Sequence, residues 1–128
     1  MIGQFKAVTV SSQPEQLRDR TKAFALRIIR LYRSLPYKTD TQVLGKQLLR
    51  CGTSVAANYR AVCRARSKAE FIAKMGVVVE EADEAILWLE LMTESGIVSM
   101  KKTESVLKEA HELTAIFAAS QRTARNAA

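Results

Sequence analysis

The chain has 128 residues, of which 48% are apolar, and carries a net charge of +7. This length suffices for one domain whose core needs no metal ion or disulfide for its stability. No apolar run approaches the roughly 20 residues that span a bilayer, and the first ten residues lack the apolar core of a secretion signal. We therefore expect neither membrane insertion nor secretion.

The two cysteines, Cys51 and Cys63, fall on one expected helix and are twelve residues apart. At about 1.5 Å of rise per residue their α-carbons are roughly 18 Å apart, which is too far for a disulfide. Two reduced thiols predict a cytoplasmic protein.

Apolar residues recur at alternating spacings of three and four in four consecutive segments, a pattern typical of helices that pack around one core. Residues 1–13 lack this pattern, and we expect them to form an N-terminal arm. The first helix is expected to open at Pro14, with Ser12 or Gln13 as its cap, and to stop at Pro36. Its core-facing seam is Leu17, Thr21, Phe24, Ile28, Leu31 and Leu35.

The second helix is expected to follow a cap at Asp40 or Thr41 and to break near Arg66. Asn58 stands in its seam where a hydrophobic residue is expected. We interpret Asn58 as a buried polar group that sets the helix register by a bond across the core, with part of a binding site as the alternative. Ser54, one turn earlier, is a candidate partner. The seam is Leu44, Leu48, Cys51, Val55, Asn58 and Val62.

Ser67 and Glu70 form a capping-box pattern that opens the third helix, and Gly96 marks its end. Ser99 can cap the fourth helix, and beyond Ser120 the chain is small and polar and is expected to fray. The two seams are Phe71, Met75, Val78, Ala82, Ala85, Leu89 and Met92, and then Thr103, Val106, Ala110, Leu113 and Phe117.

These segments predict an all-α fold, an antiparallel up-down four-helix bundle. The bundle is expected over residues 14–120, between the arm at 1–13 and a frayed tail at 121–128. Short connections favour antiparallel neighbours.

The third helix carries apolar residues outside its seam. We predict that Val77, Leu87, Trp88 and Leu91 form a subunit interface, with a wide core face in a single chain as the alternative. A homo-oligomer is favoured, because a helix that is apolar on most sides is unusual at a free surface.

Positive charge concentrates on the first two helices, whereas residues 67–96 contain two bases and seven acids. Bases on the second helix recur at the seam's spacing but are displaced by about 200°, so they face away from the core. A basic stripe with Tyr32, Tyr37 and Tyr59 near in sequence suits phosphate backbones and unpaired bases. The predicted contacts to RNA or DNA are Arg20, Arg27, Arg30, Lys46, Arg50, Arg60 and Arg64.

The alternative is that these bases are a solvated face or pair with the acids of the third helix, within or between subunits. The protein would then be an interaction scaffold. Binding of nucleic acid by the stripe would instead be electrostatic, weakly selective and steeply dependent on salt.

We expect no enzymatic activity. The single histidine, His111, lies outside the seam of the last helix. The Glu-x-x-His pairs of di-iron bundles, the phosphate-cradling loop and the close cysteine pairs of zinc sites do not occur in the sequence, so we expect no cofactor and no metal ion.

The run from Arg50 to Arg60, RCGTSVAANYR, and its continuation to Ser67 resemble the central motif of the four-helix-bundle family named for the 23S rRNA intervening-sequence proteins. The resemblance covers roughly residues 15–118. Further matches are Leu31, Tyr32, Leu35 and Pro36 in the first helix and Phe71, Lys74, Glu80, Glu81, Glu84, Trp88 and Leu89 in the third.

This resemblance implies a small up-down bundle that assembles as a ring-like homo-oligomer, commonly a pentamer, with no established enzymatic activity. Some members are encoded within rRNA intervening sequences, and a related group accompanies the reverse transcriptases of diversity-generating retroelements. Nucleic acid or a reverse transcriptase is therefore an implied partner. One departure is Ala61, where similar members have glutamate; its absence leaves Arg60 and Arg64 less neutralised, which favours anion binding.

Overall fold

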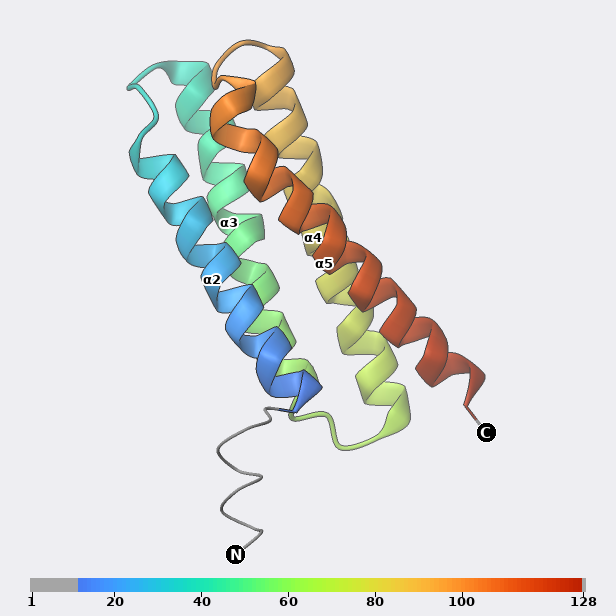
Figure 1. Cartoon of the computed structure of the whole chain (residues 1–128). Helices are drawn as coiled ribbons and strands as arrows, with labels where there is room; N and C mark the ends of the chain where they lie inside the picture. The colour runs from blue at the N-terminus through green and yellow to red at the C-terminus, as the bar shows by residue number, and fades with distance from the viewer. Residues whose placement is uncertain (1–11, 128) are drawn as a thin grey trace, which may run out of the picture.

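The structure, a computed structural model, describes residues 12–127 as four helices that run antiparallel to their neighbours (Figure 1). α2 and α4 each pack against α3 and α5, and the described parts of α2 and α4 make no close contact with each other across the bundle. The predicted antiparallel up-down bundle is confirmed, and most of the predicted arm, residues 1–13, lies outside the described part. The helices are α2 (Gln13–Arg33), α3 (Thr39–Val62), α4 (Lys68–Glu94) and α5 (Met100–Asn126).

A complete capping box begins α2. The Glu15 backbone N–H donates to Ser12 Oγ at 3.3 Å, and the Ser12 N–H donates to Glu15 Oε1 at 3.1 Å. Each side chain thus satisfies a backbone donor that the first helical turn leaves free. Of the two caps that the sequence left open, the structure selects Ser12, with Pro14 in the first turn.

The start of α3 differs from the prediction. Lys38 is the N-cap and makes no side-chain capping bond. Asp40, one of the two predicted caps, lies in the first helical turn, where its Oδ1 accepts a bond from the Thr41 N–H at 2.8 Å. A carboxylate there is favourable because the helix dipole is positive at its N-terminus. α3 ends at Val62, and the predicted break near Arg66 lies in the connection between α3 and α4.

The ends of α4 follow the prediction closely. Ser67 Oγ accepts from the Glu70 N–H at 3.0 Å, whereas the Glu70 carboxylate accepts from the Arg66 N–H, one residue before the cap. Gly96 has φ of 84°, and the Val98 N–H donates to Met92 O at 3.1 Å. A left-handed backbone of this kind ends a helix and strongly favours glycine.

The frayed tail was predicted to begin at residue 121, but α5 continues from Met100 to Asn126. Gln121 Nε2 donates to Ile72 O at 3.0 Å, and the Lys68 ammonium group donates to Ala127 O. These bonds join the last turns of α5 to the start of α4. The polar composition of the tail did not reveal these partners, which belong to a distant part of the chain.

The core follows the predicted seams in α2 and α5, where every predicted residue is buried. In α3 the structure places Tyr59 in the core, 4% exposed, with its ring stacked on Phe117 at a centroid distance of 5.5 Å.

Asn58 is half-buried and donates to Ser54 O at 2.9 Å and Ser54 Oγ at 2.8 Å, within its own helix. The predicted bond across the core is therefore replaced by a local one. A straight helix drifts from a strict heptad, which moves the core-facing position from 58 to 59.

Two glycines of α3 let α2 approach closely. A Cβ atom at Gly52 would lie 2.8 Å from Ile28 Cγ1, and one at Gly45 would lie 2.9 Å from Leu35 Cδ1. Ile28 is fully buried, so it has no room to move away. Within residues 12–127, no helix combines the length and the apolar character that crossing a membrane requires.

Gly52→Ala should destabilise the protein by about 1–3 kcal/mol, because an added methyl group overpacks the contact with Ile28. Gly76→Ala is the matched control. Its Cβ would meet the end of the Gln121 side chain at 3.0 Å, and the gain in helix propensity of about 1 kcal/mol favours the alanine. Urea unfolding followed by circular dichroism measures both. Equal effects of the two substitutions would contradict the close packing of α2 on α3.

Candidate nucleic-acid interface

A groove between α2 and α3 gathers cationic side chains over a floor of small residues. One cavity of about 620 Å³ is lined by Arg18, Asp19 and Lys22 of α2 and by Ala56, Ala57 and Arg60 of α3. A second of about 280 Å³ shares Arg18 and Arg60 and adds Cys63 and Arg64. The cations that line these two cavities, here termed the α2/α3 cluster, are Arg18, Lys22, Arg60 and Arg64.

The helical repeat and the chain topology together assemble this cluster. Arg18 and Lys22 are four residues apart on α2, and Arg60 and Arg64 are four apart near the end of α3, so each pair lies on one face. Antiparallel packing places the start of α2 beside the end of α3 (Figure 1). All four side chains are exposed, and none forms an ion pair within residues 12–127.

A second group of cations lies on the other side of α2. Arg27, Arg30 and Lys102 line a cavity of about 490 Å³ between α2 and α5, together with Leu31, Ser34 and Val106. We term these three cations the α2/α5 cluster. Arg27 Nη2 donates to Ser105 Oγ at 2.7 Å, which holds its guanidinium against α5. Arg30 and Lys102 are exposed and form no ion pair with the described residues.

Arg20, which the sequence predicted as a nucleic-acid contact, forms ion pairs with acidic residues of α5. It donates through Nη2 to Glu109 Oε1 at 2.6 Å and through Nε to Glu109 Oε2 at 3.1 Å, and lies 3.3 Å from Glu112 Oε1. The bond with Glu109 raises the pKa of Arg20. The alternative prediction paired the bases with acids of the third helix, whereas Arg20 pairs with acids of the fourth, α5.

Arg50 is also held within the subunit. Its Nη1 lies 3.2 Å from Glu81 Oε1, and its Nη2 lies 3.3 Å from Glu84 Oε1 and 3.3 Å from Cys51 Sγ. The negative charge of these groups, that of Cys51 first, raises the pKa of Arg50. Lys46 is exposed on α3 and lines none of the three cationic cavities. Of the seven predicted contacts, four therefore line these cavities: Arg27, Arg30, Arg60 and Arg64.

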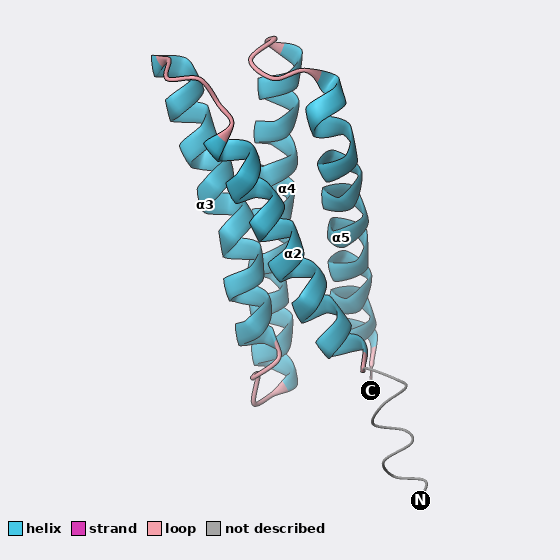
Figure 2. Ribbon diagram, turned by 60° about the vertical axis from the view of Figure 1, so that its left-hand side comes forward, coloured by secondary structure: helices cyan, strands magenta, loops and turns pink. Residues whose placement is uncertain are grey.

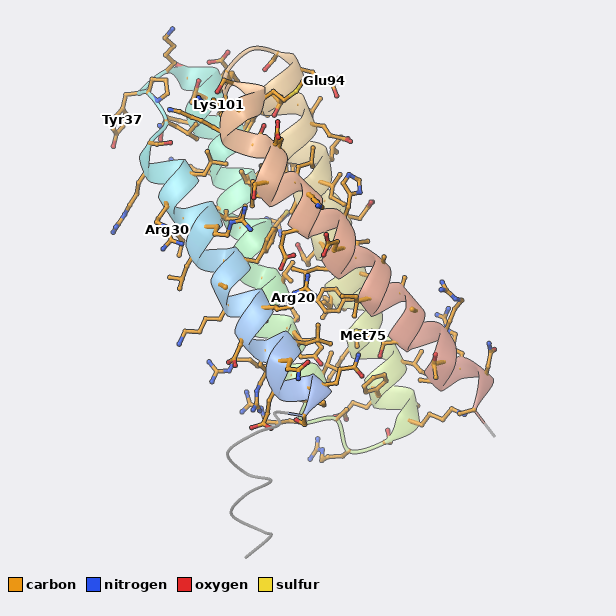
Figure 3. The ribbon with its side chains drawn as sticks, viewed as in Figure 1. Arg20, Arg30, Tyr37, Met75, Glu94 and Lys101 are labelled. Atoms are coloured by element: carbon orange, nitrogen blue, oxygen red, sulfur yellow. The ribbon has the colours of Figure 1, made fainter. Side chains whose placement is uncertain are left out.

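The predicted stacking rings do not lie at the groove. Tyr59 is buried, and that burial raises its pKa to about 12. The Tyr32 hydroxyl donates to Gln42 Oε1 at 3.1 Å. Tyr37 is 95% exposed, but it lies in the α2–α3 connection at one end of the bundle (Figure 3). Arg64 lies in the α3–α4 connection, which is at the other end (Figure 1). The helical register and the bundle topology thus separate rings and cations that are close in sequence.

Three carboxylate and thiol groups approach one another between α3 and α4. Ligand atoms of Cys51, Glu81 and Glu84 lie within 4.8 Å of one another, a spacing that could hold a metal ion. The Arg50 guanidinium contacts all three groups and balances the charge of the two carboxylates. Burial raises the pKa of the Cys51 thiol to about 11, which opposes the thiolate that a metal ion needs. The arrangement fits a structural ion-pair network.

The exposed face of α4 carries apolar side chains among acids. Val77, Leu87 and Leu91 are 40%, 46% and 42% exposed. Trp88, the fourth predicted interface residue, is half-buried against the core, and its Nε1 is buried without a hydrogen bond of normal geometry. Beside this face, an apolar cavity of about 490 Å³ between α4 and α5 contains Met100 and Leu107 and is rimmed by Glu90, Glu94 and Glu104.

Comparison with known proteins assigns the chain to a family. The model of the 23S rRNA-intervening sequence protein family matches residues 15–119, which is most of the chain. The chain belongs to the 23S rRNA-intervening sequence protein family. The resemblance noted in the sequence is thereby confirmed.

A solved structure supports the same assignment for this 23S rRNA-intervening sequence protein. It is a protein of unknown function from the S23 ribosomal protein family of Bacteroides thetaiotaomicron, 32% identical in sequence, with a TM-score of 0.80. The match covers 87% of the present chain and 99% of the other. A search of curated proteins found no match.

Sequence reasoning missed three cations of this family member, Arg18, Lys22 and Lys102. The spacing of Arg18 and Lys22 was a visible signal for a shared helix face. Whether Arg18 and Lys22 lie near Arg60, and Lys102 near Arg30, depends on how the helices pack. The printed sequence alone does not decide those neighbours.

The two cysteines should differ strongly in reactivity, because Cys63 lines the groove whereas Cys51 is fully buried. With a pKa of about 11, Cys51 is a thiolate in roughly one molecule in a thousand at pH 8. We expect iodoacetamide to modify Cys63 in the folded protein and Cys51 only after unfolding. Peptide mass spectrometry measures each rate, and Cys63→Ser is the control that removes the fast site. Comparable rates would contradict the burial of Cys51.

Proposed function

We propose that this protein is a non-enzymatic nucleic-acid-binding protein that contacts phosphates through the α2/α3 cluster. The observation that carries the proposal is that four cations share one groove and none of them is held in an ion pair within residues 12–127. Free cations that neutralise phosphates release condensed counterions, and this release drives binding to nucleic acid. The family's description as 23S rRNA-intervening sequence proteins is consistent with a nucleic-acid setting.

The shape of the groove supports contact with a backbone. Ala56 and Ala57 form its floor, so no long side chain fills the space between the cations of α2 and those of α3. Asp19 is the acid in the lining, and the four cations outnumber it. Contacts to phosphates position a nucleic acid without reading its sequence, so the proposed binding is weakly selective.

Arg60→Glu combined with Arg64→Glu should weaken binding to both RNA and DNA by about tenfold or more near 100 mM salt, because two phosphate contacts become repulsions. The matched control is Arg122→Glu with Arg125→Glu, which changes the net charge equally on the exposed end of α5. Fluorescence anisotropy with labelled oligonucleotides measures affinity, and circular dichroism checks that all variants fold.

An equal loss in both double variants would mean that net charge alone governs binding and would overturn the assignment of the groove. A footprint gives an independent check. Bound nucleic acid should slow the alkylation of Cys63, which lies in the groove wall beside Arg60 and Arg64.

The α4 face favours a second property, self-association, and with it the alternative role of an interaction scaffold. Leu87 and Leu91 are more than 40% exposed on a helix that is otherwise rich in acids. We propose that this face contributes to a homo-oligomer, which the family resemblance puts at five chains. Cations left free on α2 and α3 could then pair with α4 acids of a neighbouring subunit.

Leu87→Glu should lower the sedimentation coefficient toward that of a single chain, because a charge at a buried contact leaves an uncompensated ion. Val43→Glu is the matched control, since Val43 is 57% exposed on α3. Sedimentation velocity at low and high salt measures both variants and the unmodified protein. The α4 interface would be contradicted if the unmodified protein is a monomer, or if Leu87→Glu leaves the oligomer intact. Pairing of charges between subunits would be contradicted if salt does not affect the oligomer.

A further inference from the structure

α2 occupies one corner of the bundle, with α3 on one side of it and α5 on the other (Figure 2). A corner helix forms a ridge, because its outward face stands clear of both neighbours. Helices packed in this way have axes about 8–10 Å apart, and one helix with its side chains is about 10–12 Å across. The cavities of the α2/α3 cluster lie on one flank of this ridge, and the cavity of the α2/α5 cluster lies on the other.

The outward strip of α2 runs from one cluster to the other. Lys22, Leu26 and Arg30 are spaced by four and share this strip. Lys22 lines the cavity toward α3, whereas Arg30 lines the cavity toward α5. Leu26, 43% exposed, lies between them on the crest. The ridge therefore has an apolar crest with cations on both sides.

We infer that α2 enters the major groove of a B-form DNA duplex, with the α2/α3 cluster on the phosphates of one strand and the α2/α5 cluster on those of the other. This inference rests on the proposed function. The major groove of B-DNA is about 12 Å wide and 8.5 Å deep, which matches one helix. The α2/α3 cluster on one side of that helix and the α2/α5 cluster on the other would each face one of the two phosphate backbones that border the groove. The crest brings Leu26 to the base edges without a set of polar groups, so binding is independent of sequence.

Other nucleic acids fit this surface less well. A-form RNA has a deep, narrow major groove that does not admit a helix. A single strand gains much of its affinity from bases stacked on aromatic rings, and the three tyrosines lie elsewhere: Tyr59 in the core, Tyr32 bonded to Gln42, and Tyr37 at the far end of the bundle. The two clusters line separate cavities on opposite flanks of α2, so a single strand that follows the groove between α2 and α3 meets only the four cations of the α2/α3 cluster.

The salt dependence of affinity distinguishes these ligands. Seven phosphate contacts from both clusters to a duplex predict a slope of about −6 in a plot of log affinity against log salt. Between 50 and 200 mM salt the affinity then falls roughly 10³- to 10⁴-fold. Four contacts to a single strand predict a slope of about −3 and a loss of about 50-fold.

The test measures anisotropy of the full chain with a DNA duplex of about 12 base pairs, one of its strands, and an RNA duplex of the same sequence, across that salt range. The DNA duplex should bind most tightly and with the steeper slope. Arg27→Glu with Arg30→Glu and, separately, Arg60→Glu with Arg64→Glu should each reduce duplex affinity about tenfold or more and flatten the slope. Arg122→Glu with Arg125→Glu is the charge-matched control, and circular dichroism checks folding.

The outcomes separate this inference from the function on which it rests. Insertion of α2 into the major groove would be contradicted if binding depends on Arg60 and Arg64 but not on Arg27 and Arg30. It would also be contradicted if the single strand or the RNA duplex binds as tightly as the DNA duplex. In both cases the proposed binding of phosphates by the α2/α3 cluster would still hold. If no ligand binds, or if the control variant loses as much as the others, the proposed function fails and the inference fails with it.

Discussion

The close contact between α2 and α3 shapes both the core and the cationic surface of the bundle. Gly45 and Gly52 face α2 where any side chain would collide with Leu35 or Ile28. Ala56, one turn beyond Gly52, continues this small surface and becomes the floor of the cationic groove. The residues that let two helices approach therefore also leave the space between their outward cations open.

Pairing within the subunit decides which cations remain available. Acids of α5 hold Arg20, and acids of α4 hold Arg50, so α2 and α3 each lose one base to a neighbouring helix. Exposed ion pairs of this kind add little stability, but they occupy hydrogen-bond donors that a phosphate would otherwise use. Seven of the cations that remain line the cavities on the two flanks of α2, whereas Lys46 lies outside them. The positive charge that the sequence concentrates in the first two helices is therefore concentrated on one side of the folded bundle.

The two faces of the molecule differ in character. α2 and α3 present free cations around small grooves, whereas α4 presents Leu87 and Leu91 among acids. An assembly through α4 would cover apolar surface and leave the ridge of α2 free. Nucleic-acid binding and self-association are thus compatible, and competition between them would arise only if free cations of one subunit met α4 acids of the next.

Local patterns in the sequence determined the number of helices, most of their ends and nearly all of the core. Helical periodicity and capping chemistry act over a few residues, so Ser12, Ser67 and Gly96 are readable without a structure. The predicted cap of α3 was wrong, because Lys38 and not Asp40 or Thr41 precedes the helix. Two further local predictions failed because distant partners or helix drift decide the outcome. The end of α5 is held by α4, and the core position in α3 moved from Asn58 to Tyr59.

Periodicity and charge in the sequence were enough to predict a basic four-helix bundle of this family with an outward-facing positive stripe. Helix packing settles which bases pair with acids, which rings are buried, and that Arg18 and Lys22 meet Arg60 across a groove. The difference arises because sequence patterns act over short distances along the chain. Periodicity assigns each residue to a face of its own helix, whereas a binding surface consists of side chains from different helices, and their neighbours depend on packing and register.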